Sequence, residues 1–171
     1  QEFRSLGIAK LKKETHVLVL MSTYNGEAYL REQLDSILRQ DGVHVHLLIR
    51  DDGSTDRTCD ILAEYAVRYD NVEWEGQENV GFFRSFSMLA EKALTFPEPI
   101  DFYAFSDQDD IWMPNKLKTA CRFLEGIMNQ EAGVRSQDVP LLFSSNSLFM
   151  DDNMNIMGSF HNEAPHYTKQ N

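Results

Sequence analysis

Three carboxylates crowd into one short segment, residues 105–114, which reads FSDQDDIWMP. Asp107, Asp109 and Asp110 stand between an apolar run and a proline of the kind that begins helices. Carboxylates this close repel one another and raise one another's pKa unless a cation neutralises them or water solvates them well. The first hypothesis for the segment is therefore a divalent-metal site.

The same segment also suits an acidic, solvated loop that caps a helix starting near Pro114. Asp110 would then interact with the positive end of the helix dipole, and we favour this role for Asp110 more than for Asp109. Trp112 has apolar neighbours, so we expect it to pack under the loop rather than to stack on a sugar ring.

The composition fits a single domain that does not bind nucleic acid. The chain has 171 residues, of which 42% are hydrophobic and 11% aromatic, enough for one packed core. Its formal net charge is −11, whereas nucleic-acid proteins hold phosphates mainly with clustered Lys and Arg. Cys59 and Cys121 show no metal-binding spacing and are predicted to be buried thiols in a reducing compartment.

The chain ends and the apolar runs predict the cellular location of the protein. No apolar run approaches the roughly 18–20 residues that span a bilayer, and no signal-peptide pattern opens the chain. We expect a cytoplasmic protein, with peripheral association at the inner face of the membrane through regions outside this chain left open. Residues 1–14 are expected to be a tail or an added segment, and residues 15–171 the domain.

Strand and helix signals alternate from residue 15 onward. Continuous apolar runs, typical of parallel strands covered on both faces, occupy 17–21 and 45–49. Shorter strands are predicted at 72–75 and 101–106, helices at 27–40, 56–69, 82–94 and 114–128, and further strands at 141–144 and 146–150. This order predicts an α/β fold with a Rossmann-like, mostly parallel sheet and helices on both faces.

In such sheets, ligands bind beyond the carboxyl ends of the strands. The polar segments that follow the four predicted strands are Ser22-Thr-Tyr-Asn25, Asp51-Asp52, Asn79-Val-Gly81 and Asp107-Gln-Asp-Asp110. Together they place an aromatic ring, acidic groups and a metal-ready cluster on one rim. A base, a ribose and a diphosphate with its metal would fill such a rim.

These segments resemble the family 2 inverting glycosyltransferases of GT-A fold over roughly residues 16–128. The segment 17–25 is similar to the family's first strand and base-binding segment, 49–56 to its second acidic turn, 79–81 to its glycine turn and 107–109 to its DxD motif. The sequence of residues 106–112 is most similar to the bacterial rhamnosyltransferase branch, and so are the phenylalanines of 82–86 that precede it. This branch builds cell-wall or O-antigen polysaccharide.

The resemblance implies roles at the nucleoside end of a donor. Thr23 and Tyr24, with Asn25 beside them, would contact the nucleotide base. Asp52 would accept a hydrogen bond from the pyrimidine edge, and Glu27 would lie near the ribose. A carboxylate can accept from a pyrimidine N–H, and a tyrosine ring supplies a surface for stacking.

The resemblance also implies the diphosphate end. Asp107 would approach the ribose or the metal, and Asp109 would ligate Mg²⁺ or Mn²⁺, which hard oxygen ligands select. Asn79 and Gly81 are expected in the same nucleotide-sugar site. Arg84 lies one helical turn further on, where it would face a phosphate or be an ordinary exposed arginine, and both interpretations stay open.

Several of these polar residues could instead have ordinary structural roles. Tyr24 would also serve as a rim-packing aromatic, and Asp51-Asp52-Gly53 as a turn with a helix cap, although the DxD motif favours the functional interpretation. His44 and His46 alternate on one strand face, where a polar face is favoured over a metal site. Residues 151–153 are predicted to form a surface turn.

The predicted function is the donor domain of a metal-dependent inverting glycosyltransferase. The donor would be a dTDP- or UDP-sugar, with dTDP-rhamnose as one candidate, and the acceptor a glycan or a lipid-linked glycan. Inverting transfer needs a carboxylate base near the acceptor. The acidic residues after residue 128 are Glu131, Asp138, Asp151, Asp152 and Glu163, and none lies in a motif that we can match. The catalytic base is unknown, and we expect the N-terminal part of a longer enzyme.

Two other classes remain as alternatives. A non-catalytic nucleotide-sugar-binding module would explain why no base is recognised. A nucleotidyltransferase should carry a glycine-rich, cationic triphosphate loop after the first strand, and residues 22–27 contain no Lys or Arg, so it ranks last.

Overall fold

The computed structural model describes residues 14–130, 141–145, 147–151 and 155–160. The chain divides into two compact units, Gln1–Lys118 and Thr119–Asn171. All of the predicted tail except Glu14 lies outside the described residues. The site segments named above all fall in the first unit.

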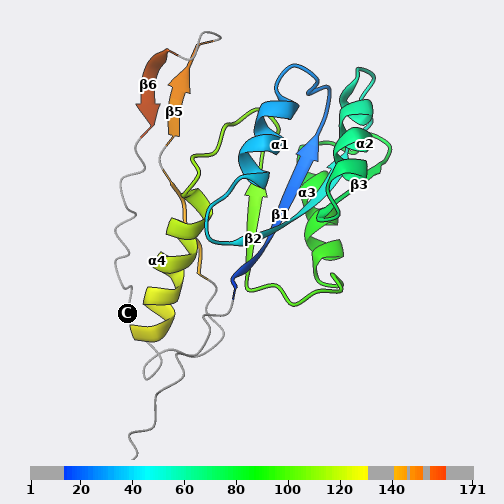
Figure 1. Ribbon diagram of the computed structural model, residues 1–171. Coiled ribbons are helices and arrows are strands. Elements are labelled where there is room, and N and C mark those ends of the chain that lie inside the picture. The colour runs from blue at the N-terminus through cyan, green and yellow to red at the C-terminus, as the bar shows by residue number, and fades with distance from the viewer. Residues whose placement is uncertain (1–13, 131–140, 146, 152–154, 161–171) are drawn as a thin grey trace, which may run out of the picture. The chain divides into compact units, whose positions relative to one another are not determined.

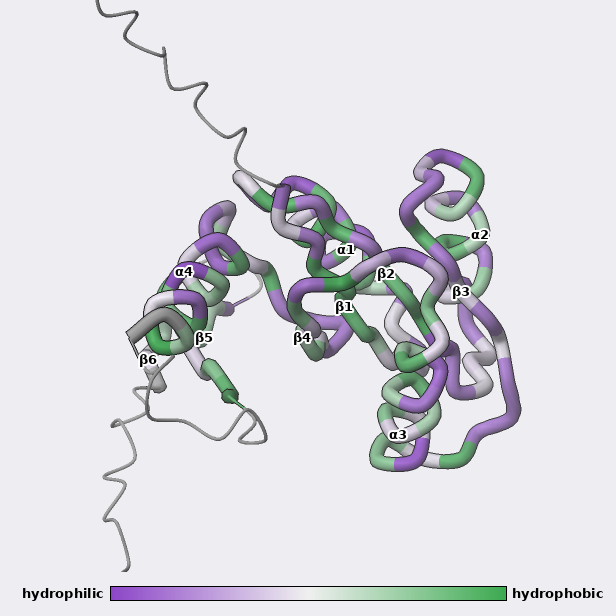
Figure 2. The backbone as a smooth tube through the Cα atoms, turned by 90° about the horizontal axis from the view of Figure 1, so that it is seen from below, coloured by the Kyte–Doolittle hydropathy of each residue, from purple (hydrophilic) through white to green (hydrophobic). Residues whose placement is uncertain are grey.

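The first unit is built on a parallel sheet with strand order β3-β2-β1-β4. The strands are β1 (His16–Thr23), β2 (His44–Asp51), β3 (Val72–Gly76) and β4 (Phe102–Ser106). The helices are α1 (Leu30–Leu38), α2 (Thr58–Arg68), α3 (Phe82–Ala93) and α4 (Lys116–Gln130), the last of which continues past the unit boundary. Helices α1 and α2 lie on one side of the row of strands and α3 on the other (Figures 1 and 2). The predicted mostly parallel sheet with helices on both faces is confirmed.

The central strand β1 explains the core. Its residues from Val17 to Met21 are at most 1% exposed, because helices cover both faces. On the α3 face, Leu18 and Leu20 form a buried cluster with Leu48 of β2 and with Leu89 and Ala93 of α3. Burial on both faces is the physical reason that β1 and β2 read as continuous apolar runs.

Three helix starts differ from the prediction, and α2 begins at Thr58 instead of residue 56. Helix α1 begins at Leu30 instead of residue 27, because Gly26 O accepts from both Tyr29 N and Leu30 N in a turn before the helix. Helix α4 begins at Lys116, two residues after Pro114, and Lys116 N donates to Met113 O.

The described part of the second unit contains a two-stranded antiparallel sheet of β5 (Ser147–Met150) and β6 (Ile156–Phe160). The prediction of a strand at 141–144 was wrong, since these residues have no regular structure, whereas the strand predicted at 146–150 is β5. Asp151 accepts hydrogen bonds from the backbone and side-chain nitrogens of Asn155, and residues 152 and 153 of the predicted surface turn lie outside the described residues. Across the described residues, no helix is both long and apolar enough to cross a bilayer.

The packing of α3 leads to a matched stability test. Leu89 is 1% exposed and Leu94, just after the same helix, is 82% exposed. Leu89→Ala should lower the free energy of unfolding by about 2–5 kcal/mol, because it removes buried apolar contacts and leaves a cavity. Leu94→Ala should change it by less than about 0.5 kcal/mol. Urea unfolding followed by circular dichroism measures both, and equal effects would contradict this packing.

Candidate functional site

The carboxyl ends of the four strands lie at one edge of the sheet. The strand registers pair Thr23 of β1 with Asp51 of β2, Asp51 with Gly76 of β3, and Met21 of β1 with Ser106 of β4. Because the strands are parallel, the four polar segments that follow them form one rim, as predicted.

Asp51 joins three segments of this rim. It is 1% exposed, and its Oδ1 accepts from Thr23 Oγ1 at 3.0 Å and from Ser54 Oγ at 2.5 Å. Its Oδ2 accepts from the backbone nitrogens of Gly53 and Ser54 and from Cys59 Sγ of α2. Burial and the neighbouring Asp51 charge raise the pKa of the Cys59 thiol to about 11. Thr23 was predicted to contact a nucleotide base, but its hydroxyl donates its hydrogen bond to Asp51.

Asp52 points to the opposite face of β2 and holds the segment after β3. Its Oδ1 accepts from Arg50 Nη1 and from Val80 N, and its Oδ2 accepts from Gly81 N at 2.9 Å. Burial alone would raise the pKa of Asp52, but donation from Val80, Arg50 and Gly81 outweighs it and leaves that pKa lowered. Each carboxylate oxygen has two acceptor sites, so these bonds leave one on Oδ2.

Arg50 is a site residue that the sequence analysis missed. Its side chain is 1% exposed, pairs with Asp52, and donates to Glu78 O at 2.9 Å and to Ser85 Oγ at 3.2 Å. Arg50 therefore ties the end of β2 to the loop after β3 and to α3. A buried arginine needs a partner, so an arginine inside an otherwise apolar strand followed by Asp-Asp was the available signal.

Gly81 begins α3 with a backbone φ of 84° and ψ of 154°, a conformation reserved for glycine. Its amide is aimed at Asp52, and a Cβ at this position would meet nothing within 4 Å. The glycine is needed for its backbone conformation and not to leave space. Asn79 and Arg84 are exposed on either side of it, so the structure brings both to the rim with their side chains at the surface.

The segment after β1 is fixed by its neighbours. Asn25 has a φ of 48°, its N donates to Ser54 Oγ, and its Oδ1 accepts from Thr55 N at 2.8 Å. Glu27 Oε2 accepts from Arg57 N at the start of α2. Asn25 and Glu27 thus join the β1 segment to the β2 segment. Tyr24 is 49% exposed between them, so its ring is open to a ligand.

Gln108, the middle residue of the DxD motif, links the first and fourth strand ends. Its Oε1 accepts from Tyr24 N at 2.8 Å, and its Nε2 donates to Tyr24 O at 3.0 Å. This reciprocal pair fixes the backbone beneath the Tyr24 ring against the acidic loop. No role was predicted for Gln108 from the sequence.

A polar stripe on α1 holds the acidic loop. Gln33 is fully buried and its Nε2 donates to Ser106 Oγ at 2.6 Å and to Asp107 O at 3.2 Å. Ser36 Oγ accepts from Trp112 N, and Gln40 Nε2 donates to Met113 O. These contacts position the loop from both ends, and none of them was expected.

Neighbouring residues hold the start of α4. Gln40 Oε1 accepts from Leu117 N, and Met113 O accepts from Lys116 N. An interaction of Asp110 with the dipole of α4 stays a prediction. Asp107 and Asp110 line a pocket of about 430 Å³. Partial burial, and then the charges of Asp110 and Asp109, raise the pKa of Asp107.

The rest of this pocket is mainly aromatic. Its walls include Phe82, Phe83, Phe86, Phe105 and Trp112. Trp112 is 5% exposed, which confirms its predicted packing role, and Lys116 Nζ lies 4.6 Å from the centre of its ring. Burial lowers the pKa of Lys116, against the opposing effect of Asp110. An apolar wall therefore faces the acidic loop.

The exposed carboxylates of Asp107 and Asp109 suit Mg²⁺ or Mn²⁺, which bind through one or two carboxylates and complete their shell with substrate phosphates and water. Partial burial and then repulsion from Asp110 and Asp109 raise the pKa of Asp107, and a bound cation would oppose both effects. Among the described residues, the acidic side chains of this loop do not bring three ligand atoms within 4.8 Å of one another. These carboxylates could therefore supply only part of a coordination shell.

The fold and the rim define a GT-A-type glycosyltransferase domain. The family model described as Glycosyl transferase family 2 matches residues 18–135, and the chain belongs to this family. The S. aureus TarS 1-349 structure in complex with UDP-GlcNAc is similar with a TM-score of 0.56 at 27% identity, over 66% of this chain and 32% of that one. A mannosyltransferase from Pyrobaculum calidifontis, solved with GDP-Man and Mn²⁺, shares the fold with a TM-score of 0.54 at 21% identity, over 65% of this chain and 32% of that one.

Curated relatives of the chain are also glycosyltransferases. A dTDP-rhamnosyl transferase, RfbG, of Shigella flexneri is 38% identical over 107 residues, which cover 58% of this chain and 35% of that protein. A putative glycosyltransferase, EpsE, of Bacillus subtilis (strain 168) is 33% identical over 111 residues, or 64% of this chain and 38% of that one. The matched region is thus little more than a third of the length of these relatives.

The buried Asp52 leads to a pH test. Since its folded-state pKa is lowered, its contribution to stability is present above the unfolded pKa of about 4 and is lost as the pH falls through the folded value. Asp52→Asn should lower the free energy of unfolding by about 3–5 kcal/mol at pH 7, because it breaks a buried ion pair, and by less at pH 3. Urea unfolding at both pH values measures this, with exposed Asp60→Asn as the control. A penalty that is the same at both pH values would refute the assignment.

Proposed function

We propose that this chain is the donor-binding part of an inverting, metal-dependent glycosyltransferase that uses a pyrimidine nucleotide sugar. The observation that carries the proposal is the rim itself, where an open tyrosine ring and two exposed carboxylates stand on loops fixed from several sides. Family membership and the UDP-GlcNAc bound to TarS support it.

The nucleoside would lie over the β1 and β2 ends. Tyr24 would stack on the base, and the remaining acceptor site on Asp52 Oδ2 would receive the pyrimidine N–H. Asn25, Glu27 and the Thr23 hydroxyl would act from beneath by fixing the loops, since their polar atoms bond to neighbouring segments. Some of the predicted nucleotide-binding residues would therefore contact the base, and the others would hold the loops in place.

The diphosphate would lie toward the β3 and β4 ends. Asp107 and Asp109 would hold Mg²⁺ or Mn²⁺, which would neutralise the negative charge that develops on the leaving diphosphate. Exposed Arg84 and Asn79, at the start of α3, would contact the phosphates or the sugar. In the transfer step, an acceptor hydroxyl gives its proton to a carboxylate base and its oxygen attacks the anomeric carbon as the bond to the diphosphate breaks. Inversion follows from attack on the face opposite the diphosphate.

The acceptor and the base are not assigned to described residues. Of the five acidic residues after residue 128, the structure describes Asp151 alone, and that carboxylate is bonded to Asn155 in a hairpin turn. We propose that an acceptor region, for a glycan or a lipid-linked glycan, completes the enzyme.

The aromatic pocket favours a 6-deoxy sugar such as rhamnose. A deoxyhexose presents a methyl group where glucose presents a hydroxymethyl group, and burying a hydroxyl against phenylalanine without a partner is unfavourable. The wall of Phe82, Phe83, Phe86 and Phe105 beside Asp107 would receive that methyl group. The likeness to the dTDP-rhamnosyl transferase of Shigella flexneri supports the same donor.

Calorimetry with dTDP and UDP, with and without Mn²⁺, tests the proposed metal role. Mn²⁺ should tighten nucleotide binding at least tenfold, because it neutralises charge between the diphosphate and the carboxylates. Asp109→Asn should abolish that gain, whereas Asp60→Asn, an exposed aspartate on α2, should keep it. Undetectable binding, or a Mn²⁺ gain that survives Asp109→Asn, would reject the proposal.

Competition between dTDP-rhamnose and dTDP-glucose tests the proposed sugar. The wild-type chain should prefer dTDP-rhamnose by about tenfold, the size of a methyl-level discrimination. Phe105→Ala should reduce that preference. Phe149→Ala is the matched control, since Phe105 and Phe149 are 58% and 57% exposed and Phe149 lies in β5. Equal affinity of the wild-type chain for both donors would remove the deoxy-sugar assignment and leave the nucleotide site untouched.

A further inference from the structure

Three histidines meet at the opposite edge of the sheet from the rim. His16 begins β1 and pairs in register with His44, which begins β2, while His46 lies two residues further along β2. These three side chains share the sheet face that α3 covers. An eight-residue strand spans roughly 23 Å from its first to its last residue, so this cluster is a strand length away from the rim.

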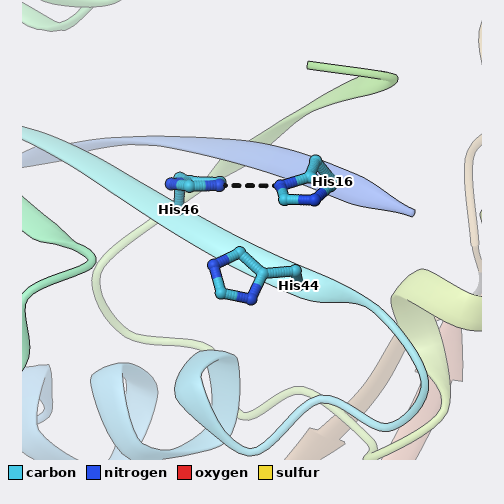
Figure 3. A group of neighbouring side chains, drawn as sticks. All are labelled: His16, His44 and His46. Atoms are coloured by element: carbon cyan, nitrogen blue, oxygen red, sulfur yellow. Dashed lines mark hydrogen bonds between the residues drawn. The ribbon is translucent and has the colours of Figure 1, made fainter. Parts of the chain in front are cut away.

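The geometry brings nitrogen atoms together. One ring nitrogen from each of His16, His44 and His46 lies within 4.8 Å of the others. His16 Nδ1 and His46 Nε2 are 3.1 Å apart, and Figure 3 shows these two rings facing each other from neighbouring strands with the His44 ring beside them. Glu98 Oε2 also lies 3.1 Å from His46 Nε2.

Neutral imidazoles do not satisfy this arrangement with hydrogen bonds. If His46 Nε2 carries the proton, that proton faces two acceptors, Glu98 Oε2 and His16 Nδ1, at the same distance. If His16 Nδ1 carries it instead, the lone pair of His46 Nε2 accepts it and the Glu98 carboxylate is left against a nitrogen that donates nothing. A cation among these atoms would satisfy all of them together.

The surroundings support a bound ion. His46 is 4% exposed and its ring edge packs against Phe96 at a centroid distance of 5.5 Å, so one ligand is held rigidly. His16 and His44 are half-buried, which leaves a path for an ion from solvent. Zinc binds nitrogen at about 2.0–2.1 Å, which places tetrahedral ligand atoms about 3.3 Å apart, close to both 3.1 Å separations.

We propose that His16, His44 and His46 bind a zinc-like divalent transition metal, and that the exposed Glu98 side chain, which already contacts His46, turns toward the ion to supply the fourth ligand. Three imidazoles and one carboxylate suit Zn²⁺ or Co²⁺, whereas Mg²⁺ prefers oxygen ligands. The ion is separate from the one proposed at Asp107 and Asp109. It joins the starts of β1 and β2 to the connection between α3 and β4, and so has a structural role.

Zinc titration of the untagged 171-residue chain by calorimetry tests this, with excess Mg²⁺ present to occupy the carboxylate site. The wild-type chain should bind one equivalent of Zn²⁺ with a micromolar or tighter Kd. His16→Ala and His44→Ala should each weaken binding at least tenfold. Asp60→Asn, which changes an exposed aspartate on α2, and Asp109→Asn should leave it unchanged.

A cobalt spectrum of the wild-type chain is a second test that does not depend on the folding of a variant. Co²⁺ at the proposed tetrahedral site should give strong visible absorption, whereas Co²⁺ among carboxylates and water at the rim should absorb weakly. Absence of Zn²⁺ binding, a weak octahedral Co²⁺ spectrum, or unchanged Zn²⁺ affinity in folded His16→Ala and His44→Ala proteins would each overturn the proposal.

Discussion

Two adjacent buried carboxylates at the end of the central strand β2 organise the rim of this domain. Asp51 and Asp52 point to opposite faces of the sheet, so each gathers donors from a different set of loops. Asp51 holds the end of β1 and the start of α2, and Asp52, paired with Arg50, holds the glycine turn that begins α3. Because a buried carboxylate needs hydrogen-bond donors to offset its lost hydration, the loops are confined to positions that supply those donors.

The acidic loop after β4 is held in a different way, by uncharged side chains of α1. Gln33, Ser36 and Gln40 bond to its backbone, and Gln108 ties it to Tyr24, so the loop is fixed while the carboxylates of Asp107 and Asp109 stay exposed. The rim therefore separates support from ligand contact. Buried groups hold the loops, and the exposed groups are free for the proposed nucleotide sugar and its ion, while buried Asp52 would serve both purposes.

The sheet and the rim segments were predictable because their signals are local. Strands buried on both faces produce continuous apolar runs, and Gly81 lies where only glycine adopts the backbone conformation. The side chains that hold the loops were missed because their roles depend on partners far away in the sequence. Gln33 lies on the apolar face of α1, and its bonds are to residues more than 70 positions away. The contact of Gln40 with the start of α4 was missed for the same reason, since Gln40 lies 77 positions from Leu117.

In the proposed site, the nucleotide and the metal ion bind together at the rim. The most direct measurement is the broadening of backbone amide NMR signals by substoichiometric Mn²⁺ in the presence of dTDP. The account predicts loss of the signals of Tyr24, Gly53, Gly81 and Asp109, and retention of those of α2 residues such as Glu64 that lie away from the carboxylates. Retained rim signals under conditions in which dTDP and Mn²⁺ are bound would contradict it.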